Sequence, residues 1–198
     1  MINSNKLNTP HIEHHPLMPF LPKNAKILML GSFPPSKTRW SIDFFYPNYQ
    51  NDMWRIMGLL FFHDKNHFCI IEEKRFNYQK ILDFCKAEGI AIFDTARSVK
   101  RLKNNASDKY LEIVTPTDIK ALLKSIPRCK SIVTTGEKAS SIVAKIFNTQ
   151  IPKVGTFVEI PFENSILKFW RMPSSSRAYP LALEKKASFY KYVFNIVD

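Results

Sequence analysis

Short apolar runs that stop at small or polar residues recur along the chain and predict the strands of a sheet. Residues 27–30 read Ile-Leu-Met-Leu and stop at Gly31, and residues 90–93 read Ile-Ala-Ile-Phe and stop at Asp94. Apolar runs of this length, bounded by glycine, proline or polar residues, are typical of strands covered on both faces. Strands are therefore predicted for residues 27–30, 90–93, 130–135, 155–160 and 165–171.

Between these runs, apolar residues recur at helical spacing. Trp54, Met57 and Phe61 would share one face of a helix, because residues three or four apart lie on the same side. A second helix would start after Asn77, a good N-cap, and end before Gly89. Helices are predicted for residues 52–62, 77–88, 117–125 and 136–147, and from Pro180 towards the C-terminus. This alternation predicts an α/β fold with a mostly parallel sheet and helices on both faces.

Two segments lack such periodicity. Residues 1–25 are polar and contain four prolines, so they are predicted to form an irregular arm packed on the domain. His11, His14 and His15 lie in this arm; without a periodic scaffold to fix their geometry, we interpret them as surface residues rather than as a metal site. Residues 96–110 carry several lysines and arginines and are predicted to be a basic, flexible loop.

The balance of charges indicates a polyanionic partner. The 198 residues, enough for one domain, include 29 Lys and Arg against 17 Asp and Glu, which gives a net charge of +12. Nucleic acid is the commonest polyanion, although lysine-rich surfaces also occur in proteins that bind none. No apolar run of about 18 residues and no signal-peptide core is present, so no membrane partner is expected. Three scattered cysteines fit a reducing cytoplasm, and we expect a monomer.

Two loops follow predicted strands and share one composition. Residues 31–35 read Gly-Ser-Phe-Pro-Pro, and residues 172–177 read Met-Pro-Ser-Ser-Ser-Arg. Serine hydroxyls and free backbone N–H groups can bind phosphate oxygens while proline stiffens the loop, although the same residues are common in ordinary turns. Aromatic and amide residues follow the first loop. Because open α/β sheets bind ligands at the carboxyl ends of their strands, a pocket for a flat polar ligand is predicted there.

Three stretches together resemble the uracil-DNA glycosylase superfamily, nearest its branch of hypoxanthine-DNA and mismatch-type glycosylases. They are LGSFPP at residues 30–35, FFYPNYQNDMW at residues 44–54, and MPSSS at residues 172–176, which is followed by a helix with Glu184, Lys185 and Lys186. The resemblance implies that residues 26–198 form one three-layer α/β/α domain with a central, mainly four-stranded parallel sheet. It also implies a DNA glycosylase of base-excision repair.

The implied reaction and residue roles are specific. The enzyme would flip a deaminated base, uracil or hypoxanthine, out of DNA and hydrolyse its N-glycosidic bond, without cutting the strand and without a metal or other cofactor. Asn51 would position the attacking water, and Phe45 would stack on the base. The implied base-binding residues are Gly31, Ser32, Phe33, Phe45, Asp94 and Thr95. The implied DNA-binding residues are Pro34, Ser174, Ser175, Ser176, Arg177 and Lys185, with Lys186 beside it as a further backbone contact.

The chain departs from the pattern of these relatives at two positions. Many of them carry a polar residue where this chain has Phe33, and a histidine where it has Met172. Asn51, or less favourably Asp43, would then carry the chemistry, but an asparagine at this place is equally a good helix N-cap. Two alternatives therefore remain: a non-catalytic nucleic-acid-binding member of the same superfamily, and an α/β enzyme that acts on a free nucleoside or another small anion.

Overall fold

A central sheet of five strands organises the chain, which the computed structural model describes over residues 11–102 and 110–195. In spatial order the strands are β5 (Ile90–Asp94), β2 (Ile27–Gly31), β8 (Ser131–Thr135), β10 (Ser165–Met172) and β9 (Thr156–Phe162). The first four run parallel, and β9 pairs antiparallel with β10 at one edge. The predicted α/β fold and its four parallel strands are confirmed.

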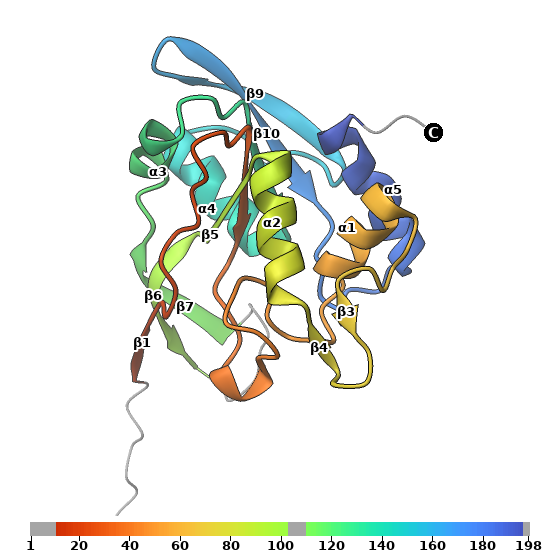
Figure 1. Cartoon of the computed structure of the whole chain (residues 1–198). Coiled ribbons are helices and arrows are strands. Elements are labelled where there is room, and N and C mark those ends of the chain that lie inside the picture. The colour runs from red at the N-terminus through yellow and green to blue at the C-terminus, as the bar shows by residue number, and fades with distance from the viewer. Residues whose placement is uncertain (1–10, 103–109, 196–198) are drawn as a thin grey trace, which may run out of the picture.

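Helices on both sides of the sheet complete three layers. In the view of Figure 1, α2 lies in front of the sheet and α4 behind it, while α1 packs against α5. The helices are α1 (Met53–Phe62), α2 (Tyr78–Glu88), α3 (Ile119–Ser125), α4 (Glu137–Phe147) and α5 (Leu183–Phe194), with a short 3₁₀ turn at Lys37–Arg39. A small hairpin of β3 (Cys69–Ile70) and β4 (Arg75–Phe76) lies between α1 and α2 in sequence.

The ends of the helices follow from side chains at their termini. The Asn77 side chain accepts a hydrogen bond from the backbone N–H of Lys80 at 3.1 Å, and Gly89 has the left-handed φ of 67°. Both ends of α2 are therefore as predicted. The prediction that Pro180 opens the last helix was wrong, because α5 begins at Leu183. The residue before it, Ala182, is extended, so the preceding residues form turns instead of a first helical turn.

The prediction of a flexible loop over residues 96–110 was wrong at its start. Residues 96–101 form β6 (Ala96–Arg101), which pairs antiparallel with β1 (Ile12–His14) and with β7 (Leu111–Pro116) in a separate three-stranded sheet. One side of β6 packs on Phe33 while its basic residues remain more exposed. Because β6 is buried on one side only and carries basic residues, its composition resembles that of an exposed loop. Residues 103–109, with Lys103, Asn104, Asn105 and Lys109, and residues 1–10 lie outside the described residues.

The N-terminal arm lies along the edge of the central sheet. Phe20 and Ile92 of β5 exchange two backbone hydrogen bonds, at 3.0 and 2.9 Å, and the N–H of His15 donates to the carbonyl of Arg97 at 2.8 Å. The interpretation of His15 as a surface residue was wrong, because its side chain is only 2% exposed. The reason is its pairing with Asp94, which lies 79 residues further along the chain.

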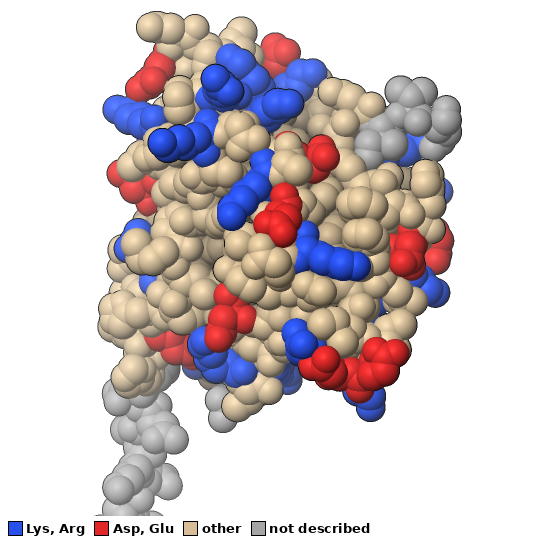
Figure 2. All heavy atoms as spheres, viewed as in Figure 1, with Lys and Arg blue, Asp and Glu red and all other residues tan. Residues whose placement is uncertain are grey.

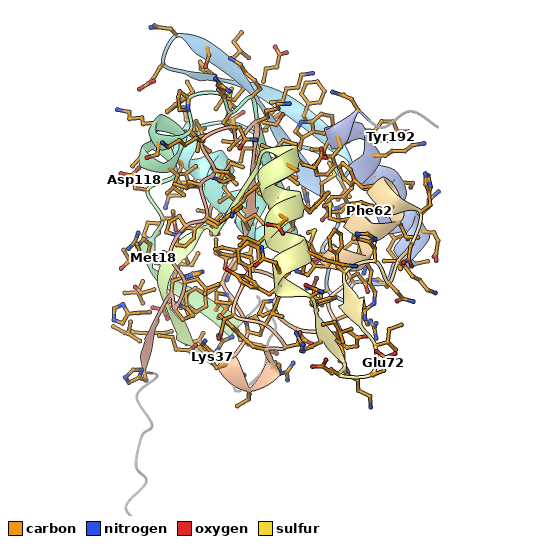
Figure 3. All side chains as sticks on the ribbon, in the orientation of Figure 1. Met18, Lys37, Phe62, Glu72, Asp118 and Tyr192 are labelled. Atoms are coloured by element: carbon orange, nitrogen blue, oxygen red, sulfur yellow. The ribbon has the colours of Figure 1, made fainter. Side chains whose placement is uncertain are left out.

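Apolar and charged side chains on the surface are spread over several elements. Met18 and Tyr192, 78% and 60% exposed, stand at opposite sides of the view in Figure 3. Figure 2 shows basic and acidic side chains mixed over this face, with a basic group near the turn of the β9–β10 hairpin. On this face, basic side chains are therefore interspersed with acidic ones. Within the described residues, no helix is long and apolar enough to span a bilayer.

Adjacent residues of β10 offer a test of the burial pattern. Leu167 is 1% exposed and Ile166 is 63% exposed. We expect Leu167→Ala to lower the free energy of unfolding by about 2–5 kcal/mol, because it removes core contacts and leaves a cavity. The matched control Ile166→Ala should change it by about 0.5 kcal/mol or less. Urea unfolding monitored by circular dichroism measures both, and equal losses would contradict the assigned faces of β10.

Candidate functional site

A pocket of about 280 Å³ opens where the four parallel strands end. Gly31 ends β2, Asp94 ends β5 and Thr135 ends β8, while Ser174 follows β10 by two residues; all four line the pocket. Within this sheet, β5 follows β2 in sequence and lies on one side of it, whereas β8, β10 and β9 lie on its other side. The pocket is thus at the point where the strand order reverses, the usual ligand site of open α/β sheets.

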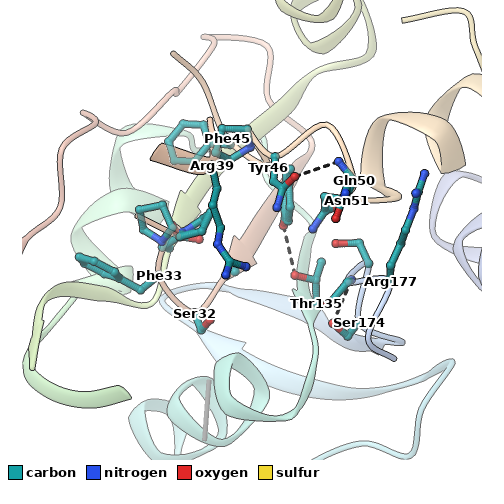
Figure 4. Close-up of a pocket in the computed structure, with 18 of the residues that line it drawn as sticks. Ser32, Phe33, Arg39, Phe45, Tyr46, Gln50, Asn51, Thr135, Ser174 and Arg177 are labelled. Carbon is teal, nitrogen blue, oxygen red and sulfur yellow. Dashed lines mark hydrogen bonds between the residues drawn. The ribbon is translucent and has the colours of Figure 1, made fainter. Parts of the chain in front are cut away.

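Polar and aromatic side chains enclose this pocket from several elements. In Figure 4, Arg39 and Tyr46 extend towards its middle, whereas Asn51 and Arg177 lie along one side and Phe33 points away on the other. The complete lining also includes Gly31, Ser32, Pro34, Pro35, Phe45, Pro47, Asn48, Gln50, Asp94, Thr135, Ser174, Ser175, Ser176 and Ala178. Residues from opposite ends of the chain therefore meet in one cavity, and both strand-end loops contribute to its lining.

Tyr46 is held in the pocket by an uncommon backbone conformation. Its φ of 50° lies in the left-handed region, which costs a non-glycine residue about 1–2 kcal/mol. The phenol lies 3.2 Å from the hydroxyl of Thr135. Burial raises the pKa of Tyr46, and the nearby Asp94 carboxylate acts in the same direction. Tyr46 therefore presents a neutral hydroxyl, able to donate or accept a hydrogen bond, at every physiological pH.

Two phenylalanines predicted to bind a base differ in their surroundings. Phe45 lines the pocket and is only 3% exposed, and its ring meets that of Phe93 edge to face at 6.1 Å. Phe33 also contributes to the lining, but its side chain packs against Val99 and Leu111 of the second sheet. Phe45 is thus held as a rigid apolar wall, while Phe33 anchors the first loop to the β6–β7 pair.

Asn51 both lines the pocket and supports the start of α1. Its Oδ1 accepts a hydrogen bond from the backbone N–H of Met53 at 2.9 Å, and its backbone carbonyl accepts one from Arg55 at 3.2 Å. The residue immediately before α1 is Asp52, whose side chain makes no capping bond. The capping and the pocket-lining interpretations of Asn51 are therefore compatible, since one bond fixes the amide beside the cavity.

The serine loop, residues 173–177, is anchored from behind. Three of its backbone carbonyls accept hydrogen bonds: Pro173 from the Tyr190 hydroxyl at 2.9 Å, Ser175 from the Asp52 N–H at 2.9 Å, and Ser176 from the Lys186 amine at 2.8 Å. Two of these donors belong to α5 and one to the start of α1. The loop is thereby fixed to both helices, and its serine side chains remain at the pocket.

A buried ion pair connects these same elements. The Lys186 amine is 2.8 Å from Asp52 Oδ2, and the Arg177 guanidinium is 3.4 Å from Asp52 Oδ1. Lys186 is completely buried. Its interpretation as a DNA-backbone contact was therefore wrong, because a buried ammonium group needs a carboxylate and hydrogen-bond acceptors around it and cannot reach solvent. Its role is to join Asp52 to the serine loop.

Asp94 lies at the floor of the pocket beside Gly31. An ideal Cβ on Gly31 would stand 2.4 Å from Asp94 Oδ1 and 3.8 Å from the Tyr46 hydroxyl. Only a residue without a side chain leaves room for this carboxylate. The other carboxylate oxygen, Oδ2, is 2.9 Å from Nε2 of His15. The arm thus contributes an ionisable group to the wall behind the site.

Three other candidates lie outside the lining of the pocket. Thr95 is fully buried, and its hydroxyl is 3.5 Å from the carbonyl oxygen of Ser32. Lys185 is exposed on α5. Asp43, considered as a substitute for Asn51, is 80% exposed and pairs with Lys37 at 2.6 Å. Thr95 thus contacts the loop of residues 31–35 from the protein interior, and Asp43 is a surface residue.

Three polar residues of the site are not among the site residues predicted from the sequence. Thr135 carries the same signature as Asp94, a polar residue at the end of a buried strand, and could have been found by it. Arg39 ends a short 3₁₀ turn in a stretch without any periodic signal, and His15 depends on a distant partner. Met172 is fully buried and lies outside the lining.

A second hollow of about 400 Å³ shares Arg177 with the pocket. It is lined by Asp52, Arg55, Lys65, Arg177, Leu181, Leu183 and Lys186. Four basic side chains against one acid make this hollow electropositive. Arg177 therefore stands between the pocket and a surface that favours anions.

Comparison with known proteins places the fold. No family model matches the chain, and no curated protein sequence does either. The structure is similar to the solution structure of a proposed uracil DNA glycosylase from Methanosarcina acetivorans, with a TM-score of 0.60, 21% sequence identity, and coverage of 93% of this chain and 97% of that chain. Similarity at this identity establishes a common fold, a central sheet flanked by helices that is parallel in part.

The buried pair of Asp52 and Lys186 predicts a large effect on stability. We expect Asp52→Ala to lower the free energy of unfolding by about 3–5 kcal/mol, because it leaves the Lys186 ammonium group buried without its carboxylate. The control Asp43→Ala removes the exposed partner of Lys37 and should cost about 1 kcal/mol or less. Urea unfolding of both variants tests this, and a small effect of Asp52→Ala would mean that water reaches Lys186.

Proposed function

We propose that this protein is a DNA glycosylase that flips a deaminated base, uracil or hypoxanthine, into the pocket and hydrolyses its N-glycosidic bond. The observation that carries the proposal is the meeting of Phe45, Asn51, Asp94 and the serine loop around one cavity of about 280 Å³. The fold common to a proposed uracil DNA glycosylase supports it, as does the net charge of +12.

The pocket offers a flat base one apolar wall and several polar contacts. Phe45 provides an aromatic surface on which a base can stack. Tyr46, Thr135 and Asp94 present hydroxyl and carboxylate groups at the floor and side. A base within a duplex cannot reach such a cavity, so binding requires extrusion from the stack at a cost of about a few kcal/mol. Arg177 and the serine hydroxyls lie where backbone phosphates would hold the extruded nucleotide.

In the proposed reaction, water attacks C1′ of the sugar as the bond from C1′ to the base nitrogen breaks. The sugar develops positive charge, and the base leaves with the electron pair of the broken bond before it takes up a proton. Asn51 orients the water, because its amide is fixed by the bond from Met53 N–H. The guanidinium of Arg39 and the neutral hydroxyl of Tyr46 can stabilise the anionic base.

Base release by Asn51→Ala is the decisive measurement. Oligonucleotides that carry uracil, hypoxanthine or xanthine, single- and double-stranded, are incubated with the protein, and alkali then reveals abasic sites. We expect wild type to release at least one deaminated base, and Asn51→Ala to be slower by about 10²–10⁴-fold, the usual contribution of a group that positions or activates water.

Asn77→Ala is the matched control. Like Asn51, Asn77 bonds a backbone N–H at the start of a helix, that of Lys80 at 3.1 Å, but it lies outside the pocket lining. Its loss should cost about 1 kcal/mol of stability and leave base release unchanged. Equal rates for wild type and Asn51→Ala would move the chemistry to another residue, and equal losses in both variants would reduce the role of Asn51 to helix capping.

A non-catalytic nucleic-acid-binding role is the second candidate. The apolar Phe33 and Met172 stand where relatives carry polar residues, and the Asn51 side chain already bonds Met53. This alternative predicts binding to DNA without release of any base. An enzyme that acts on a free nucleoside would instead show activity on monomers and no retention on DNA.

Salt dependence tests the contact with the DNA backbone. If Arg177 neutralises one phosphate, Arg177→Ala should weaken DNA binding and reduce the slope of log K against log salt concentration by about 1. Fluorescence anisotropy of a labelled duplex over a range of KCl concentrations measures both. Lys37→Ala, on the exposed pair with Asp43, is the control. An unchanged slope in Arg177→Ala would remove this residue from the backbone contact.

A further inference from the structure

His15 is a buried histidine that no step of the proposed reaction uses. Its side chain is only 2% exposed, and its ring lies against Phe33, Phe45 and Phe93 at centroid distances of 5.4, 6.1 and 4.5 Å. Within this aromatic surrounding, Nε2 is 2.9 Å from Asp94 Oδ2. Three aromatic rings and one carboxylate thus fix the plane of the imidazole directly behind the pocket.

The contacts of the second ring nitrogen, Nδ1, are compatible with a proton on Nε2. The backbone N–H of Leu17 donates to Nδ1 at 3.1 Å, and the carbonyl of Leu17 is 3.0 Å from the same atom. When Nδ1 accepts from the N–H, the proton of a neutral imidazole lies on Nε2. When the ring is cationic, Nδ1 donates to the carbonyl and Nε2 again carries a proton. In both forms, Nε2–H donates to Asp94, whereas a neutral ring with its proton on Nδ1 would place two acceptors 2.9 Å apart.

This donor leaves Asp94 one oxygen for the pocket. Oδ2 receives the His15 proton, while Oδ1 lies over Gly31, where an ideal Cβ would stand 2.4 Å away. An ionised carboxylate is only an acceptor. Asp94 is 8% exposed, so its free oxygen has little water around it and needs a donor from whatever enters the pocket.

We propose that His15 is a positioning residue that holds Asp94 as an acceptor for the ring N–H of a lactam base. This inference rests on the proposed glycosylase function and names its substrate class. Uracil at N3, and hypoxanthine and xanthine at N1, carry such an N–H beside a carbonyl. Cytosine at N3 and adenine at N1 carry a lone pair at the same position, which would face Asp94 Oδ1 with like charge. Deamination of cytosine to uracil, or of adenine to hypoxanthine, thus creates the N–H that the carboxylate binds.

The His15 proton also balances the charge during bond cleavage. The base leaves as an anion, and an adjacent bare carboxylate would oppose this step. The bond from Nε2–H to Oδ2 draws negative charge away from Oδ1 and towards the buried side of Asp94. The three phenylalanines around the imidazole offer no other donor at this place.

The experiment uses a base in which C–H replaces the ring N–H. Because this replacement also changes the tautomer of the neighbouring carbonyl, its effect is compared between protein variants. Oligonucleotides carrying hypoxanthine or its 1-deaza analogue, in which C–H replaces N1–H, and matching uracil and 3-deazauracil oligonucleotides are compared in single-turnover base release. The deaza penalty is the ratio of the two rates. In wild type we expect a penalty of about 10- to 100-fold, the range for a hydrogen bond to a charged group.

Substitutions of His15 should change this penalty according to their donor. His15→Leu and His15→Phe keep an apolar side chain among the phenylalanines but donate nothing, so we expect slower release, a penalty about 10-fold smaller than that of wild type, and an unchanged KM for DNA. His15→Gln retains an amide N–H and should restore most of the penalty. A full wild-type penalty in either folded apolar variant overturns the inference. Thermal unfolding identifies the variants that are folded.

Wild type alone supplies a second criterion. A long-range ¹H–¹⁵N spectrum of the imidazole nitrogens should show the His15 proton on Nε2 over the pH range of activity, and a proton-free Nε2 overturns the inference even if every variant fails to fold. Base release with no deaza penalty overturns the role of His15 and Asp94 alone, whereas no release of any base by wild type overturns the glycosylase function and, with it, this inference.

Discussion

The pocket depends on one buried ion pair, that of Asp52 and Lys186. The lysine amine bonds both the carboxylate and the carbonyl of Ser176, while the N–H of Asp52 bonds the carbonyl of Ser175. The ion pair therefore joins the start of α1 to α5 in the interior, although its two residues are 134 apart in the chain. Because a buried charge without its partner is very unfavourable, the two walls of the cavity cannot separate without exposing it.

This closure explains how side chains from loops hold a defined geometry. The parallel strands fix Gly31, Asp94 and Thr135 at one edge of the sheet, but Asn51 and the serine loop lie beyond the strand ends. Their positions come from the ion pair and from the hydroxyl of Tyr190 beneath the loop. Hydrolysis of a glycosidic bond needs a water held in place relative to a sugar, and such rigidity is what these contacts provide.

Local patterns predicted most of the fold but only part of the site. The four parallel strands and α2 follow from short-range signals, namely apolar runs that end at polar residues, and caps such as Asn77. The strand β6 was missed because its stability comes from Phe33 and from its partner strands rather than from its own composition. The buried states of His15 and Lys186 depend on carboxylates far away in the chain, for which a single sequence carries no signal.

The arm that delivers His15 also covers the outer edge of β5 through Phe20. That strand is apolar from Ile90 to Phe93, and a bare apolar edge is a template for pairing with other chains. During synthesis the arm leaves the ribosome well before β5 exists, so it must remain undocked until its acceptor has been made. Until Phe20 pairs with β5, the new chain exposes a strand edge that can pair with other chains. The docking of the arm therefore completes the wall behind the pocket and protects the chain against aggregation in the same step.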